Sequence, residues 1–185
     1  MKVTETELEG VLIIEPAVYE DARGFFLETY HQNRYRGRGM RADFVQDNLS
    51  FSKKHTLRGL HFQHPCDQAK LVQVTGGTVF DVAVDIRRGS PSFGKWTGTQ
   101  LSDENRRQVF IPEGFAHGFC VISEYAVLMY KCSDFYAREC EGGILWSDPD
   151  LNIRWPVENP LVSEKDMKLP RFRDLATDRL PVYRQ

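Results

Sequence analysis

One stretch of the chain, residues 56–85, gathers side chains that can bind an anion and move a proton. It contains Arg58, His61, His64 and Lys70, separated by apolar residues. Cationic groups on a rigid strand predict an anionic ligand with one proton-transferring group beside it. The alternative is an exposed basic edge strand, but the interleaved apolar residues argue against a free edge.

The start of this stretch alternates like a β-strand, and the alternation assigns its side chains to two faces. Period two places residues 58, 60 and 62 on one face and residues 57, 59 and 61 on the other. Arg58 and His61 are therefore expected on opposite faces.

A second candidate site is the turn at residues 112–117, which has the spacing P-x-G-x-x-H. This spacing is typical of the second motif of cupins, in which glycine shapes the turn and the histidine, here His117, points into a β-barrel. The alternative is a histidine that is hydrogen-bonded within the turn. A metal-binding cupin also needs H-x-H and a glutamate in its first motif. The corresponding region instead offers His61 and His64 on opposite faces, with Lys70 about where an acidic ligand is wanted, so no metal is expected.

Composition predicts an ordinary globular chain and excludes several classes of protein. The 185 residues are 41% hydrophobic and 27% charged, which fits one domain over residues 1–185. A formal charge of −2 gives no global basic field for nucleic acid. The acidic start of the chain does not resemble a signal peptide, and the apolar run at residues 11–14 is too short to span a bilayer. We therefore expect a cytoplasmic protein that binds neither nucleic acid nor membrane.

The four cysteines are expected to be free thiols. They show no C-x-x-C pair, and a reducing compartment keeps thiols unpaired. We interpret them as residues that fill space in the interior. They are Cys66, Cys120, Cys132 and Cys140.

The elements that must position these groups are predicted to be short β-strands. Apolar and β-branched runs recur at roughly ten-residue intervals, with glycine turns and no long amphipathic helix, which predicts an all-β sandwich or barrel. Glycine turns are expected at 75–78 and 113–118, and residues 31–41 form either a short helix or a loop. From residue 148 onward, prolines predict a wrapping tail with at most short helices. Strands are expected at 3–14, 25–30, 44–51, 79–86, 96–101, 108–112, 119–122 and 126–131.

A series of short motifs carries a family resemblance. They are Arg23-Gly-Phe-Phe, Gln46-Asp-Asn, the run 57–63, the run 80–87, the P-x-G-F-A-H-G-F segment at 112–119 and Ser163-Glu-Lys-Asp. Together and in this order, from about residue 3 to residue 170, they resemble the dTDP-4-dehydrorhamnose 3,5-epimerases. The resemblance implies a cupin jelly roll (double-stranded β-helix) whose N-terminal strands are exchanged in a homodimer. It also implies a dTDP-4-keto-6-deoxy sugar as substrate, with no cofactor.

The chemistry of that family is proton abstraction and return at sugar carbons 3 and 5, next to the ketone. It needs a base on one face, an acid on the other and a cation or donor for the enolate oxygen. By resemblance, His61 is the base, Asp166 orients it, Tyr130 is the acid and Lys70 lies near the keto oxygen. Without the resemblance, Tyr130 would be interpreted as a core aromatic and Lys70 as a solvated lysine.

The resemblance also implies a set of substrate contacts. Arg23, Arg58 and His117 resemble contacts to the diphosphate and sugar, where charge-assisted donors are required. Phe26 is expected to pack against the nucleoside, and strand exchange would place Arg23, Phe26 and Glu28 in the partner's site. Further ligand contacts are expected at Glu28, Gln46, Asn48, Lys70, Glu141 and Lys165.

Other functions that the residues leave open are a relative acting on one carbon only, a 3,4-ketoisomerase, a non-catalytic sugar-nucleotide-binding cupin and a metal-dependent cupin oxygenase. His61 together with Tyr130 favours the epimerase.

Overall fold

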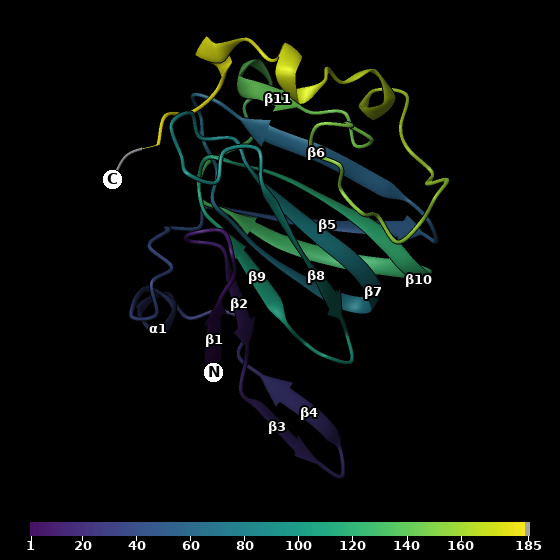
Figure 1. The fold of residues 1–185 in the computed structure, drawn as a ribbon. Helices are drawn as coiled ribbons and strands as arrows, with labels where there is room; N and C mark the ends of the chain where they lie inside the picture. The colour runs from purple at the N-terminus through teal and green to yellow at the C-terminus, as the bar shows by residue number, and fades with distance from the viewer. Residues whose placement is uncertain (184–185) are drawn as a thin grey trace.

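The computed structural model describes residues 1–183. Its main body is a nine-stranded sheet in the order β1-β2-β9-β7-β10-β6-β11, in which β5 also pairs with β10 and β8 with β7. A separate two-stranded hairpin, β3–β4, projects away from the body (Figure 1). The strands are Lys2–Glu5 (β1), Leu12–Glu15 (β2), Val18–Asp21 (β3), Gly24–Leu27 (β4), Gln46–Lys53 (β5), Leu57–Gln63 (β6), Lys70–Asp85 (β7), Trp96–Ser102 (β8), Gln108–Ile111 (β9), Phe115–Cys132 (β10) and Glu141–Gly143 (β11). The helices are Gln32–Arg36 (α1) and the 3-10 turns Arg138–Cys140 (η1), Asp166–Lys168 (η2), Phe172–Asp174 (η3) and Thr177–Arg179 (η4).

Two long antiparallel strands, β7 and β10, organise the sheet. On one side of this pair, the first part of β7 joins β9 and its second part joins β8. On the other side, the first part of β10 joins β6 and its second part joins β5. The sheet therefore curls into the jelly roll, and both ends of the β7–β10 pair can contribute side chains to one interior.

The two faces of β7 fill two different hydrophobic cores, and the alternation shifts by one residue at the bulge around Gly76 and Gly77. Val82, Val84 and Ile86 pack in a cluster with Leu60 and with aromatic residues of the C-terminal tail. Residues 72, 74, 79 and 83 pack in the other cluster, inside the roll. Burying a Val or Ile side chain is worth about 1.5–3 kcal/mol, so both faces of this strand contribute to stability.

The all-β prediction is confirmed, but several predicted turns are wrong. Residues 75–78 are not a hairpin turn: they lie inside β7, where the pairing register with β10 shifts between residues 121 and 128. Gly77 has a φ of 76°, and a Cβ at this position would lie only 2.0 Å from the carbonyl oxygen of Tyr125. Its glycine thus permits a close approach of two strands within a bulge.

The expected division of residues 113–131 into a turn and two strands is also wrong. Strand β10 begins at Phe115 and continues to Cys132, so only residues 112–114 form the turn. At the N-terminus the single expected strand at 3–14 is two strands, β1 and β2. Residues 31–41, expected to be either a short helix or a loop, contain the short helix α1 followed by a loop.

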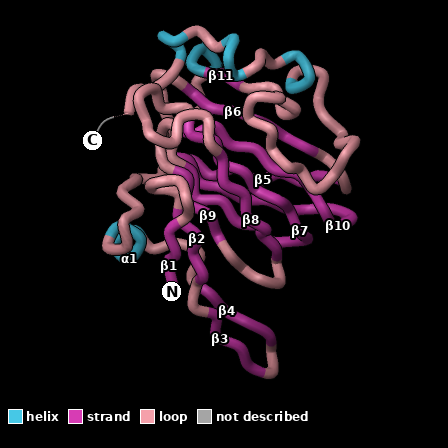
Figure 2. The backbone as a smooth tube through the Cα atoms, in the orientation of Figure 1, coloured by secondary structure: helices cyan, strands magenta, loops and turns pink. Residues whose placement is uncertain are grey.

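The C-terminal segment has the predicted wrapping character. It crosses β6 and β11 at the top of the sheet in Figure 1, and Figure 2 shows it as loop interrupted by short helical turns. The buried carboxylate of Asp148 (2% exposed) fixes its course by accepting hydrogen bonds from the backbone N–H groups of Asp150, Leu151 and Phe172.

The prediction of four free cysteines is wrong. Cys66 and Cys140 form a disulfide, with Cα atoms 5.8 Å apart, whereas Cys120 and Cys132 are free and buried. The two partners lie 74 residues apart in sequence and meet because β11 pairs with β6. No local spacing signals such a pair, since tertiary pairing alone brings it together. Among residues 1–183, no helix has the length and apolar content needed to cross a membrane.

Candidate active site

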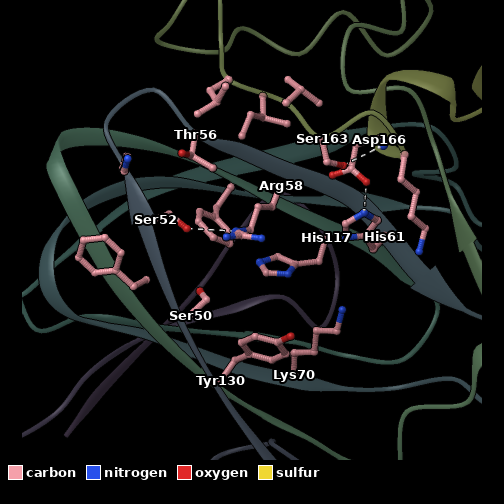
Figure 3. A pocket seen from close by; sticks show the side chains of 17 residues that line it. Ser50, Ser52, Thr56, Arg58, His61, Lys70, His117, Tyr130, Ser163 and Asp166 are labelled. Carbon is pink, nitrogen blue, oxygen red and sulfur yellow. Dashed lines mark hydrogen bonds and ion pairs between the residues drawn. The ribbon is translucent and has the colours of Figure 1, made fainter.

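A cavity of about 730 Å³ opens between the curled sheet and the C-terminal tail. Strands β5, β6, β7 and β10 form its floor and walls, and residues 161–166 of the tail form its rim (Figure 3). A smaller cavity of about 150 Å³ also has His61, Lys70 and Tyr130 among its lining residues. Predicted site residues lining one or both cavities are Gln46, Asn48, Arg58, His61, Lys70, His117, Tyr130, Glu141, Lys165 and Asp166.

Arg58 and His61 line the same cavity, so the prediction that they face opposite sides is wrong. Opposite β10, His61 pairs with His117 and Arg58 pairs with Phe119, which leaves one extra residue on β6 between the two pairs. This bulge includes Gly59, whose φ is 129°, and a Cβ added there would lie 2.6 Å from the Cα of Gly118. A bulge shifts the alternation by one residue, which is invisible to a period-two count.

His61 and Asp166 form a hydrogen-bonded pair at one end of the cavity. The Nε2 atom of His61 lies 2.8 Å from Oδ1 of Asp166, and the Gly59 amide donates to Oδ2 at 3.2 Å. The carboxylate is buried, whereas the His61 side chain is 36% exposed toward the cavity. Burial favours a higher pKa for Asp166, but the hydrogen bond and charge of His61 and the Gly59 amide outweigh it and hold the pKa below the usual value. The pair is thus an ionised carboxylate orienting an imidazole.

Tyr130 and Lys70 lie across the cavity from this pair (Figure 3). The Lys70 ammonium is 6.0 Å from the centre of the Tyr130 ring. Burial raises the pKa of Tyr130, so its hydroxyl keeps its proton at neutral pH and can donate it. Burial also lowers the pKa of Lys70, partly offset by the charges of Cys132 and Asp81. Tyr130 also packs against the inner core, so the core interpretation and the site interpretation both describe this side chain.

Arg58 and His117 supply donors between these two ends. The Arg58 Nε donates to Ser52 Oγ at 3.0 Å, which directs the guanidinium along the cavity. The Nε2 of His117 lies 2.9 Å from Oδ2 of the buried Asp81. The prediction that His117 points inward is confirmed by its place in the cavity wall.

The edge of the site is held by further polar pairs. Lys165 donates to both carboxylate oxygens of Glu141 at 2.7 Å, and the Tyr136 hydroxyl donates to the same group at 3.2 Å. The bond from Lys165 lowers the pKa of Glu141, and the same bond raises the pKa of Lys165. Beside them, Gln46 donates to Asn48 at 3.0 Å.

Three predicted contact residues lie outside both cavities. Arg23 is exposed on the β3–β4 hairpin and is paired with Asp21, and the Phe26 ring is 70% exposed. Glu28, just after the hairpin, accepts from Arg34 at 3.0 Å. The assignment of Arg23, Phe26 and Glu28 to a partner's site stays a prediction.

Several polar residues of the cavity were not predicted. They include Ser52 and Thr56 on the wall, and Ser163, whose Oγ accepts from the Asp166 amide at 3.0 Å. Asp81, the partner of His117, was missed as well, although its position on the face of β7 that carries residues 79 and 83 was a usable signal. No group of three residues with His, Cys, Asp or Glu side chains lies close enough to hold a metal ion within residues 1–183.

The sequence profile of one protein family, described as dTDP-4-dehydrorhamnose 3,5-epimerase, matches residues 5–174. The chain belongs to this family. It is 55% identical over 176 residues to a dTDP-4-dehydrorhamnose 3,5-epimerase of Shigella flexneri, covering 94% of this chain and 97% of that protein. It is 50% identical to the enzyme of the same name from Methanothermobacter thermautotrophicus, covering 97% and 96% of the two chains.

A solved structure shares the fold of this family member over its whole length. It is the crystal structure of a dTDP-6-deoxy-D-glucose 3,5-epimerase from Legionella pneumophila in complex with dTDP-4-keto-L-rhamnose. The TM-score is 0.97 at 48% sequence identity, with 100% of this chain and 99% of that chain covered. The cupin jelly-roll prediction is therefore confirmed.

Proposed function

We propose that this protein converts dTDP-4-dehydro-6-deoxy-D-glucose to dTDP-4-dehydro-L-rhamnose by inverting sugar carbons 3 and 5. The observation that carries the proposal is the placement of the His61–Asp166 pair across one cavity from Tyr130 and Lys70. The names and the bound nucleotide sugar of the similar proteins support the same substrate class.

The proposed chemistry uses proton transfer alone. His61 removes the proton from a carbon next to the ketone, and the electron pair moves to the keto oxygen as an enolate. Lys70 is the cation for that oxygen, because a charged donor in a largely buried site stabilises developing charge. Tyr130 then gives its proton to the opposite face of the same carbon, which inverts it. No cofactor takes part in this scheme.

The proposal assigns the anionic half of the substrate to the basic groups of the site. Arg58 and His117 bind the diphosphate and sugar, because charge-assisted hydrogen bonds are strong and directional. Gln46, Asn48 and the Glu141–Lys165 pair lie beside the catalytic groups and contact the ligand from the edge. The whole chain acts as one catalytic domain. A charged nucleotide does not cross a bilayer unaided, which favours a cytoplasmic location for the reaction.

The deciding experiment follows proton exchange from the dTDP-4-ketosugar in deuterated water by NMR. We expect deuterium at both carbon 3 and carbon 5. His61→Asn should abolish exchange, whereas Tyr130→Phe should still exchange but yield little doubly inverted product. A general acid or base contributes about 10²–10⁴-fold, so both defects are easily measured. Deuterium at one carbon only would replace the proposal with a monofunctional epimerase.

We also propose a homodimer in which the hairpin of one subunit completes the site of the other. Its support is the hairpin, which projects from the body (Figure 2) and leaves Arg23 and Phe26 exposed. Mixing inactive Arg23→Ala and His61→Asn proteins gives mixed dimers with one fully intact site if Arg23 serves the partner. Activity should then reappear on mixing. Continued inactivity of verified mixed dimers would show that Arg23 does not act across the interface.

A further inference from the structure

Asp81 is a buried carboxylate behind the wall of the candidate site, in contact with His117, and the proposed chemistry gives it no task. It lies in the middle of β7, opposite Phe119 of β10. Its side chain is only 1% exposed, and its Oδ2 is 2.9 Å from Nε2 of His117. Burying a carboxylate costs free energy unless it is hydrogen-bonded or paired, so a buried position that faces ligand-binding groups calls for a physical reason.

The second carboxylate oxygen of Asp81 is unpaired in the part of the chain that the structure describes. Oδ1 is buried and has no hydrogen-bond partner among residues 1–183. Most buried polar atoms in folded proteins have a partner, and the exceptions call for an explanation. Asp81 thus has one paired and, within the described residues, one unpaired carboxylate oxygen inside the roll, where low polarity strengthens its electrostatic interactions with nearby groups.

The two groups that feel this charge both line the cavity. One is His117, which is in direct contact with Asp81. The other is Lys70 on the same strand, whose pKa is lowered by burial and raised by the charge of Asp81. Asp81 therefore couples one proposed ligand contact to the proposed enolate-stabilising cation.

We infer that Asp81 is a positioning residue of the reaction, which fixes His117 through its Nε2 atom and provides the counter-charge of Lys70. The inference rests on the proposed function. A hydrogen bond from Nε2–H of His117 to the carboxylate fixes the ring orientation and leaves Nδ1 as the atom available to a ligand. The negative charge keeps Lys70 in the ammonium form that the enolate requires. Asp81 itself does not touch the substrate.

Other ionisable groups face the same region and bear on any pH profile. They include Tyr136 and, on β11, Glu141. The others are Lys53 on β5, Arg58 and His61 on β6, Lys70 on β7, His117, Tyr130 and Cys132 on β10, and Lys165 and Asp166 on the tail.

The test is Asp81→Asn, which keeps the size of the side chain and removes its charge. We expect kcat to fall about 10- to 100-fold, the loss seen when the carboxylate that orients a metal-binding histidine is removed. Without the carboxylate, Lys70 loses its proton at lower pH, so the alkaline limb of the kcat profile should move to lower pH. In addition, ¹⁵N NMR should show a changed protonation pattern of the His117 ring nitrogens.

Asp85→Asn is the matched control, because Asp85 lies on the same strand and is fully buried. Its partners are Arg87, Ser90 and Ser92 in the following loop, away from the cavity. The control should lower the melting temperature while leaving the pH profile and the His117 spectrum unchanged. If both variants lose activity only in proportion to stability, Asp81 is merely structural and the inference is overturned.

Two readouts separate this inference from the proposed function, since neither needs turnover. They are the His117 spectrum and the affinity for dTDP measured by calorimetry, which we expect to weaken in Asp81→Asn. The wild-type spectrum alone also tests the inference if the variant does not fold. A His117 ring that carries its proton on Nδ1 and not on Nε2 throughout the active pH range would overturn it.

Discussion

Replacing Asp166 by Asn isolates the contribution of the carboxylate that orients His61. The side chain keeps its size but loses its charge, and it can no longer accept charge-assisted bonds from both His61 and the Gly59 amide. A hydrogen bond to a charged group contributes about 1.5–3 kcal/mol. If that energy is realised when the imidazole becomes cationic, kcat should fall by about 10- to 150-fold, since about 1.4 kcal/mol corresponds to tenfold.

The assay measures kcat and KM separately, together with proton exchange at carbons 3 and 5. The loss should lie in kcat and in the exchange rate, because the charge of Asp166 stabilises the histidine only once it has taken a proton. Asp148→Asn is the control, since Asp148 is a buried carboxylate that bonds only backbone amides. It should reduce stability and leave kcat of the folded protein unchanged. An Asp166→Asn protein with wild-type kcat would refute the assigned role.

The same substitution predicts a pH dependence of stability. The pKa of Asp166 lies below the usual value of 3.8 in the folded protein. A lowered folded pKa stabilises the fold above the unfolded pKa, and this contribution disappears as the pH falls through the folded value. The melting-temperature difference between wild type and Asp166→Asn should therefore be largest near neutral pH and shrink below about pH 3.9. A difference that grows on acidification would contradict the assigned interaction.

Three further outcomes are expected. Arg58→Ala should weaken dTDP binding in calorimetry by about 1.5–3 kcal/mol, against roughly 0–1 kcal/mol for the exposed Lys54→Ala; equal losses would place Arg58 outside the binding site. Activity should survive exhaustive chelation, since the metal motif of the fold is incomplete and Lys70 stands about where an acidic ligand is wanted; rescue of a chelated, inactive enzyme by one divalent ion would contradict this. Thiol titration of the unfolded, unreduced protein should detect the two free cysteines and not Cys66 or Cys140, and a count of four thiols would rule out the disulfide.

The parts of the fold that were predicted correctly are those that depend on short-range sequence patterns. The two faces of residues 79–86 follow from alternation, and the glycine context of residues 112–117 correctly turns His117 inward. The continuity of β7 and β10 was missed, because Gly76 and Gly77 have the composition of a hairpin turn while serving a bulge between two long strands. Local chemistry cannot separate those cases, since both need glycine.

The parts of the site predicted least from the residues alone depend on contacts distant in sequence. His61 and Asp166 lie 105 residues apart, and only the family resemblance joined them beforehand. The shared face of Arg58 and His61 depends on one extra residue in a bulge. The inward face of Asp81 could have been read from the alternation of β7, but its partner His117 lies 36 residues away on β10 and is not marked by any local spacing.

The C-terminal tail carries Asp166 and is the last part of the site to be synthesised. The strands that carry Arg58, His61, Lys70, His117 and Tyr130 are all synthesised before Asp166, which arrives with the segment that crosses the finished roll. The backbone of that segment bonds to residues 55 and 57 through Leu161, next to the site itself. A chain that ends before this crossing lacks Asp166, the partner of its base, and also the tail residues that pack against Leu60. Proton transfer therefore depends on the tail being in place, and turnover marks a chain that has been translated at least as far as Asp166.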